Sequence, residues 1–152
     1  MHHHDSNTQG QAPILITGAT GKTGRRVARR LEQLGLPVRR ASRSARAPFD
    51  WHEPSTWDAA LDGVQAVYLA YSPDLAVPGA SDVIERFVGR AAASGVGRIV
   101  LLSGRGEAEA EVCEGIVQAS GLTWTVVRAA WFDQNFSEGE CLPMMLEGAI
   151  AL

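Results

Sequence analysis

The sequence at 13–24 reads Pro13-Ile14-Leu15-Ile16-Thr17-Gly18-Ala19-Thr20-Gly21-Lys22-Thr23-Gly24. The apolar run is typical of a buried strand, and the amphipathic pattern after the glycines predicts a helix. A glycine-rich turn between the two brings backbone N–H groups and the positive helix end up to a pyrophosphate. Any tight turn can carry glycines, so the strand, the helix and a basic strand end downstream support the interpretation. We predict a dinucleotide site whose loop residues are Gly18, Thr20, Gly21, Lys22, Thr23 and Gly24.

The chain has 152 residues, which predicts one domain, and 45% of them are hydrophobic, as in a globular protein. No apolar run approaches the roughly 18 residues of a membrane span. We interpret residues 1–11 as a disordered leader or tag remnant, and 12–152 as the folded domain. We expect no metal at His2, His3 and His4, because no other histidine or cysteine lies nearby.

The two cysteines, Cys113 and Cys141, are isolated in an ordinary domain. This usage predicts free thiols in a reducing compartment, and hence a cytoplasmic protein.

Charge is distributed unevenly along the chain. Residues 1–46 carry Lys22 and eight arginines against two acids, whereas 47–152 carry five arginines against fifteen acids. A basic half is a feature of nucleic-acid-binding proteins. However, the arginines of 25–30 fall on the polar face of a helix whose apolar side is Val27, Leu31 and Leu34, and no aromatic residue interleaves with them. We interpret them as a solvated face and do not expect nucleic-acid binding.

Strand and helix patterns alternate throughout, which predicts an α/β fold with a parallel sheet. The expected strands lie at 13–17, 38–42, near 49–50, 66–71, 98–103 and 122–128; the expected helices lie at 23–34, 54–61, 81–93 and 108–119, with another beginning within 141–152. Right-handed crossovers then give a doubly wound (Rossmann) sheet of strand order 3-2-1-4-5-6.

The residue beyond the second strand faces the adenosine ribose in such a fold. NAD enzymes place an acid there, but this chain has Ser42 and Arg43, with no acid between Glu32 and Asp50. An arginine can hold a 2′-phosphate in a bidentate fork. Arg39 and Arg40 point to opposite faces of the strand, so at most one of them joins Arg43. We therefore predict NADP(H) rather than NAD(H).

Several further motifs resemble the NmrA-like, atypical short-chain dehydrogenase/reductase family. They are the glycine loop, Ala41-Ser42-Arg43-Ser44, Phe49-Asp50-Trp51, the stretches 57–64 and 67–69, and Gly121–Arg128 followed by Trp131–Phe136. The resemblance implies NAD(P)(H) binding, with quinone or azo reduction in some members and nucleotide sensing in others. It also implies that Asp50 accepts a hydrogen bond from adenine, although a turn cap has the same sequence appearance.

Two departures from that family are visible. Members are typically about double this length, so the chain looks like a cofactor domain without its substrate lobe. In addition, Ala129 stands where the family commonly has proline.

No catalytic residue can be named from the sequence. Carbonyl-reducing short-chain dehydrogenases use a Tyr-x-x-x-Lys pair, but the only lysine is Lys22 and the only tyrosines are Tyr68 and Tyr71. Direct hydride transfer to an electron-poor acceptor, such as a quinone or azo compound, needs little acid catalysis. The residues expected beside the nicotinamide are Tyr71, Ser72, Ser103 and Gly104. Each has an equally good structural interpretation; Ser103, for example, can satisfy a strand-end amide.

The remaining aromatic and acidic residues have mainly structural interpretations. We expect the four tryptophans to be mostly core, with Trp51 bordering the adenine because it follows a strand end. The acids Glu107, Glu109, Glu111 and Glu114 are expected to complement a helix dipole.

Two functions remain: an NADP(H)-dependent oxidoreductase with a small-molecule acceptor, and a redox-sensing regulator without turnover. In either case a homo-oligomer or partner chain is expected to cover the last strand and the apolar residues Leu142, Met144, Met145 and Leu146.

Overall fold

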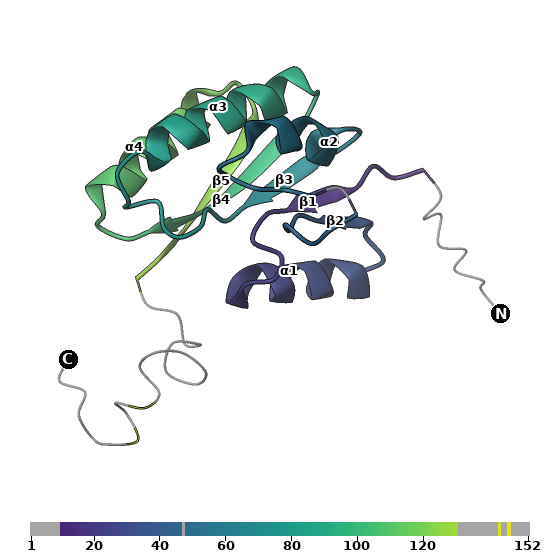
Figure 1. The fold of residues 1–152 in the computed structure, drawn as a ribbon, viewed down its shortest axis with the longest axis horizontal. Helices are drawn as coiled ribbons and strands as arrows, with labels where there is room; N and C mark the ends of the chain where they lie inside the picture. Colours follow the sequence, from purple (N-terminus) through teal and green to yellow (C-terminus); the bar gives the residue numbers. More distant parts are fainter. Residues whose placement is uncertain (1–9, 47, 131–142, 144–145, 147–152) are drawn as a thin grey trace.

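The computed structural model describes residues 10–46, 48–130, 143 and 146. They form a parallel sheet with α1 on one face and α2, α3 and α4 on the other (Figure 1). The elements in chain order are β1 Ile14–Ile16, α1 Lys22–Gln33, β2 Val38–Arg40, the short 3-10 helix Pro54–Thr56, α2 Trp57–Leu61, β3 Ala66–Leu69, α3 Ala80–Ala93, β4 Arg98–Gly104, α4 Ala108–Ala119 and β5 Thr123–Ala129. Most of the expected leader, and most of the expected helix within 141–152, lie outside the described residues.

The sheet has the order β2-β1-β3-β4-β5. A parallel, alternating α/β fold is therefore confirmed, but the order 3-2-1-4-5-6 is wrong in one element, because the strand expected near Phe49 and Asp50 does not form. When that strand is removed and the remaining strands are renumbered in chain order, the expected order becomes the observed one. The Phe49 N–H donates instead to the Ser42 carbonyl at 3.0 Å, and the Asp50 N–H donates to Thr56 Oγ1 at 3.0 Å. Both N–H groups are thus bonded within the loop instead of to a sheet neighbour.

The main hydrophobic core lies between the sheet and α2–α4. Its centre is an aromatic cluster in which the Trp51 ring lies 5.0 Å from that of Phe87 and 4.9 Å from that of Phe49. Trp57 is fully buried in the same cluster. The expectation that the tryptophans lie mostly in the core is therefore confirmed for Trp51 and Trp57. It is wrong for Trp124 on β5, which is exposed.

Helix α1 covers a second, smaller core containing Ile16, Ala28 and Tyr68. The arginines of 25–30 are exposed, as predicted for a solvated face. Val27 and Leu31 pack against the sheet, but Leu34 is exposed because the helix ends at Gln33 and the chain turns at Gly35, whose φ is 75°.

None of the helices within the described ranges is long and apolar enough to cross a membrane. Cys113, which lies on α4, is buried and carries a free thiol. Burial raises the pKa of this thiol, so Cys113 is unreactive in the folded domain. Cys141 lies outside the described residues.

Candidate functional site

A cavity of about 450 Å³ lies at the carboxyl ends of the strands. This volume is within the range of about 300–1,000 Å³ that small-molecule sites occupy. Both Gly18, after β1, and Ala70, after β3, line it. The crossover from β1 runs to β2 and the crossover from β3 runs to β4, in opposite directions, so the cavity lies at the topological switch point where doubly wound sheets bind ligands.

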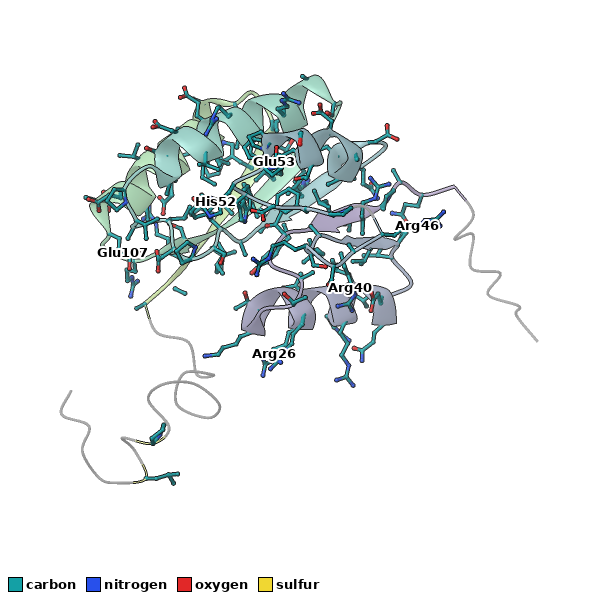
Figure 2. All side chains as sticks on the ribbon, in the orientation of Figure 1. Arg26, Arg40, Arg46, His52, Glu53 and Glu107 are labelled. Atoms are coloured by element: carbon teal, nitrogen blue, oxygen red, sulfur yellow. The ribbon has the colours of Figure 1, made fainter. Side chains whose placement is uncertain are left out.

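Ten of the residues predicted for the site line this cavity: Gly18, Thr20, Gly21, Thr23, Ser42, Arg43, Asp50, Trp51, Tyr71 and Ser72. Lining residues that were not predicted are Ala41, Phe49, His52, Ala70, Pro73 and Leu102. Each of these flanks a predicted residue in sequence, so proximity to a strand end is the signal that could have identified them. His52 is labelled in Figure 2.

The glycine loop packs tightly against the start of α1. Gly18 has φ 62°, in the left-handed region, and its carbonyl accepts the Gly21 N–H at 2.9 Å. A Cβ on Gly24 would lie 2.2 Å from the Gly18 carbonyl oxygen, so only glycine lets α1 approach this closely. Gly24 therefore shapes the loop from behind rather than lining the cavity.

The N-terminus of α1 fits an anionic group. Its N-cap is Gly21, no described side chain caps it, and no acid lies in the first turn. The first N–H groups of a helix have no partner within the helix and carry its positive dipole end. Together with the Thr20 and Thr23 side chains, this end offers the donors that a pyrophosphate requires.

Thr17 is a positioning residue that the sequence analysis did not single out. It is fully buried, and its hydroxyl accepts the Ala70 N–H at 2.8 Å and lies 3.1 Å from the carbonyls of Tyr68 and Ala70. These contacts tie the ends of β1 and β3 together beneath the cavity. A hydroxyl at the end of a buried strand is the signal in the sequence.

The three arginines around the end of β2 lie in different surroundings. Arg40, beside α1 in Figure 2, forms a two-point ion pair with Glu32, with N–O distances of 3.0 and 2.8 Å. Arg39 Nη1 donates to the Ala60 carbonyl at 2.8 Å, on the opposite face. Both are engaged outside the cavity, so Arg43 is the arginine that lines it.

The Asp50 carboxylate supports a turn. Its Oδ1 accepts the His52 N–H at 2.8 Å, while the Asp50 carbonyl accepts the Trp57 indole N–H at 2.8 Å. Trp51 is 7% exposed and packs within 5.1 Å of Tyr71, so it forms a wall of the cavity rather than an open stacking surface. Burial raises the pKa of Tyr71, so its phenol is protonated at neutral pH.

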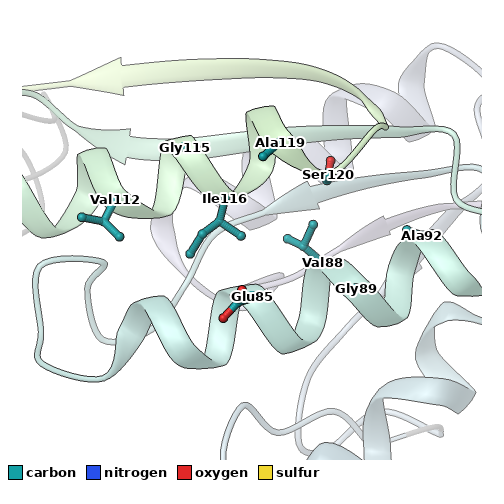
Figure 3. Close-up of a pocket in the computed structure, with 9 residues that line it drawn as sticks. All are labelled: Glu85, Val88, Gly89, Ala92, Val112, Gly115, Ile116, Ala119 and Ser120. Atoms are coloured by element: carbon teal, nitrogen blue, oxygen red, sulfur yellow. The ribbon is translucent and has the colours of Figure 1, made fainter.

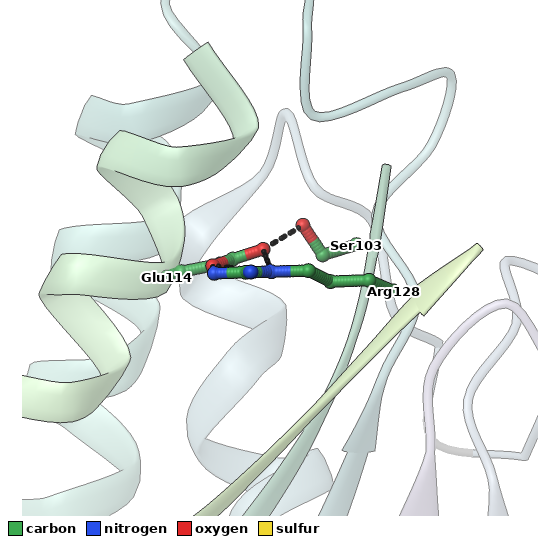
Figure 4. A network of polar contacts seen from close by, with 3 residues as sticks. All are labelled: Ser103, Glu114 and Arg128. Carbon is green, nitrogen blue, oxygen red and sulfur yellow. Dashed lines mark hydrogen bonds and ion pairs between the residues drawn. The ribbon is translucent and has the colours of Figure 1, made fainter. Parts of the chain in front are cut away.

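Lys22, Ser103 and Gly104 do not line the cavity. The Ser103 hydroxyl donates to Glu114 Oε1 at 2.7 Å, and Arg128 Nε donates to the same oxygen at 3.0 Å (Figure 4). Gly104 lies under the Glu107 carboxylate, which occupies the place where a Cβ would stand. The side chain of Ser103 thus joins β4, α4 and β5 instead of facing a ligand.

Glu114 differs from the other acids of α4. Glu109 and Glu111 lie in the first helical turn, where they complement the dipole as expected, whereas Glu114 is 2% exposed and paired with Arg128. The hydrogen bonds from Arg128 outweigh burial and hold the pKa of Glu114 below its usual value. The expectation of a simple dipole role is therefore wrong for Glu114.

A second hollow, of about 470 Å³, lies between α3 and α4 (Figure 3). Its lining is mostly glycine, alanine and valine, with Glu85 as its one charged residue and Ser120 as its other polar side chain. Since it lacks converging polar groups and lies away from the carboxyl ends of the strands, the first cavity is the stronger candidate for the functional site.

Comparison with known proteins shows that this chain is similar to about one half of several longer proteins. A family model described as NAD(P)H-binding matches residues 18–144. An agroclavine dehydrogenase of Claviceps fusiformis is 33% identical over 144 residues, covering 82% of this chain and 48% of the relative. An NAD(P)H azoreductase of Xenophilus azovorans is 32% identical over 143 residues, covering 80% and 49%. The chain thus spans about half the length of these relatives.

A similar solved structure is an NADPH-dependent quinone oxidoreductase of Escherichia coli in complex with NADPH. It has a TM-score of 0.62 and 24% identity, covering 89% of this chain and 54% of that one. At this level of identity the likeness supports the fold.

Proposed function

The chain belongs to the family of NAD(P)H-binding domains, and from that premise we propose that it binds NADP(H) and serves an NADP(H)-dependent oxidoreductase of the NmrA-like kind. One observation carries the choice of nucleotide. Arg43 lines the cavity after β2, while Arg39 and Arg40 are engaged elsewhere. Asp50, the carboxylate that lines the cavity, is engaged in its own turn.

The chain's own residues bind and orient the nucleotide in this proposal. The uncapped start of α1, with Thr20 and Thr23, holds the pyrophosphate, and Arg43 with Ser42 holds the 2′-phosphate. When bound, the cofactor supplies a hydride. Tyr71 and Ser72 lie after β3, at the switch point, where their hydroxyls can orient the nicotinamide end.

The acceptor class in this proposal is an electron-poor compound such as a quinone or azo compound. The azoreductase relative supports it, and so does the absence of a Tyr-x-x-x-Lys pair from the sequence. The Cys113 thiol supports a cytoplasmic setting for the same reaction.

Replacing Arg43 tests the choice of nucleotide. Charge-assisted hydrogen bonds contribute about 1.5–3 kcal/mol, so Arg43→Ala should weaken NADPH binding at least tenfold and leave NADH binding nearly unchanged. Arg46→Ala is the matched control, since Arg46 is an exposed arginine of the same loop that does not line the cavity. Equal losses for both nucleotides in Arg43→Ala would overturn the assignment.

A second candidate is a nucleotide-sensing protein without turnover. It is favoured by the Ser103 hydroxyl, which is committed to Glu114. NADPH oxidation measured with a panel of quinones and azo compounds separates the two. Saturable turnover supports the oxidoreductase, whereas NADPH binding without turnover supports the sensor.

A further inference from the structure

The lining of the cavity is divided unequally between the two sides of the switch point. Eleven of its sixteen lining residues belong to the loop after β1, the end of β2 or residues 49–52, a segment bonded to Ser42 through the Phe49 N–H. Four more follow β3, at the switch point itself, and the remaining one is Leu102 on β4. In a doubly wound sheet a dinucleotide lies across the switch point, with its adenosine half on the side of β1 and β2. The cavity is therefore built mainly for that half.

Side chains at the ends of β4 and β5 are used to join elements of the protein. The buried Ser103 hydroxyl donates to Glu114, and Arg128 donates to the same carboxylate. The Arg105 N–H donates to the Ala129 carbonyl at 2.9 Å, which ties the two strand ends together. These strand ends lie on the side of the switch point that receives the nicotinamide half. Ser103 and Arg128 thus direct their donors into the protein rather than toward that half.

The acids on that side lie outside the cavity. The oxidised nicotinamide ring carries a positive charge and the reduced ring does not, so a charge close to the ring is needed to separate the two forms. The Glu107 carboxylate lies over Gly104. Glu109 and Glu111 are exposed on α4, where salt screens their charges. None of these three acids lines the cavity, so they are poorly placed to distinguish the oxidised from the reduced ring.

We propose that this chain recognises the 2′-phospho-ADP part of NADP(H) and is indifferent to the redox state of the ring, an inference that rests on the proposed binding of NADP(H). Its ligand class is the 2′-phosphorylated adenosine diphosphates, with or without a nicotinamide attached. Arg43 holds the 2′-phosphate and the start of α1 holds the pyrophosphate, so charged and dipolar contacts fall on this part. After β3 the lining offers the hydroxyls of Tyr71 and Ser72, whose neutral hydrogen bonds are weaker. The chain therefore responds to the amount of NADP(H) and not to the ratio of its two forms.

Matched nucleotides test this inference by isothermal calorimetry of the 152-residue chain. From NADPH to 2′-phospho-ADP-ribose only the nicotinamide is lost, and the dissociation constant should rise by less than about tenfold. From 2′-phospho-ADP-ribose to ADP-ribose only the 2′-phosphate is lost, and the constant should rise by at least about tenfold. The constants for NADPH and NADP+ should differ by less than about tenfold, since the two share the part that is held.

Two arginine variants locate the recognition on one side of the switch point. Arg43→Ala should weaken NADPH and 2′-phospho-ADP-ribose by the same factor, at least about tenfold, because both carry the phosphate that it contacts. Arg105→Ala is the matched control, since Arg105 is an exposed arginine directly after β4 that does not line the cavity, and it should change neither constant.

The outcomes separate this inference from the proposed function. If NADPH binds more than about tenfold more tightly than 2′-phospho-ADP-ribose, the inference is overturned while NADP(H) binding stands. The same holds for a preference of more than about tenfold between NADPH and NADP+, or for an Arg105→Ala variant that weakens NADPH. Failure of every nucleotide to bind overturns the proposed function, and the inference falls with it.

Discussion

Removing Arg128 and removing Glu114 should cost different amounts of stability, although the two side chains form one ion pair. Glu114 is 2% exposed, whereas the Arg128 side chain is 55% exposed. In Arg128→Ala the buried carboxylate keeps only the hydrogen bond from Ser103. In Glu114→Gln the guanidinium regains water, and the amide oxygen still accepts from Ser103. The first change therefore strands a buried charge and the second does not.

The magnitudes follow from this difference in exposure. Leaving one partner of a buried ion pair uncompensated costs about 3–5 kcal/mol, and we take the lower end because Arg128 is half in water. A hydrogen bond to a charged group contributes about 1.5–3 kcal/mol. We expect Arg128→Ala to lower the free energy of unfolding by about 3 kcal/mol, and Glu114→Gln by about 1.5 kcal/mol.

Urea unfolding at neutral pH, followed by tryptophan fluorescence, measures both costs. Arg98→Ala is the control, because Arg98 is an exposed arginine at the opposite end of β4 and should cost little. Equal costs for the two network variants, or an Arg128→Ala variant as stable as Arg98→Ala, would refute the reasoning.

The pH dependence gives an independent check on the same pair. Arg128 holds the folded-state pKa of Glu114 below its unfolded value, so the stabilisation is complete above the unfolded pKa of about 4.3. It is lost as the pH falls through the lowered pKa. The free energy of unfolding should therefore fall more steeply below the unfolded pKa in the wild type than in Glu114→Gln.

Three further changes test the loop and the core. Gly24→Ala should abolish nucleotide binding, measured by calorimetric titration, because its Cβ would lie 2.2 Å from a backbone oxygen. A Cβ on Gly89, in α3, would meet no other atom, so Gly89→Ala should stabilise the fold by about 0.5–1 kcal/mol, measured by thermal unfolding. Thr17→Val should cost about 1–3 kcal/mol in urea unfolding, because the Ala70 N–H loses its partner, and a cost near zero would contradict the assigned role. The Cys113 thiol should react with a thiol reagent only as fast as the domain opens, so rapid labelling under native conditions would contradict its burial.

The parts of the fold that follow local rules were predictable from the sequence. The glycine loop, the helix after it and the alternation of elements depend on spacing within a few residues. The strand expected near Phe49 failed because its backbone groups are taken by Ser42 and Thr56. A short apolar pair between turns does not reveal such partners.

The ion pair of Glu114 was missed for a related reason. Its partner lies on the next strand, and no local rule joins the two. The helical stripe nevertheless contained a signal, because Glu114 falls in line with the buried residues Ala110, Cys113 and Val117. A charge on an apolar stripe indicates a buried partner. The same three-dimensional pairing removed Ser103 from the site, while Arg43 followed from its place beyond a strand end.

Titration of the 152-residue chain with NADPH and with NADH, by isothermal calorimetry, tests the central claim most directly. The open start of α1 and the Arg43 side chain predict one site per chain, with NADPH bound at least tenfold more tightly than NADH. Failure to bind either nucleotide, or tighter binding of NADH, would contradict the account.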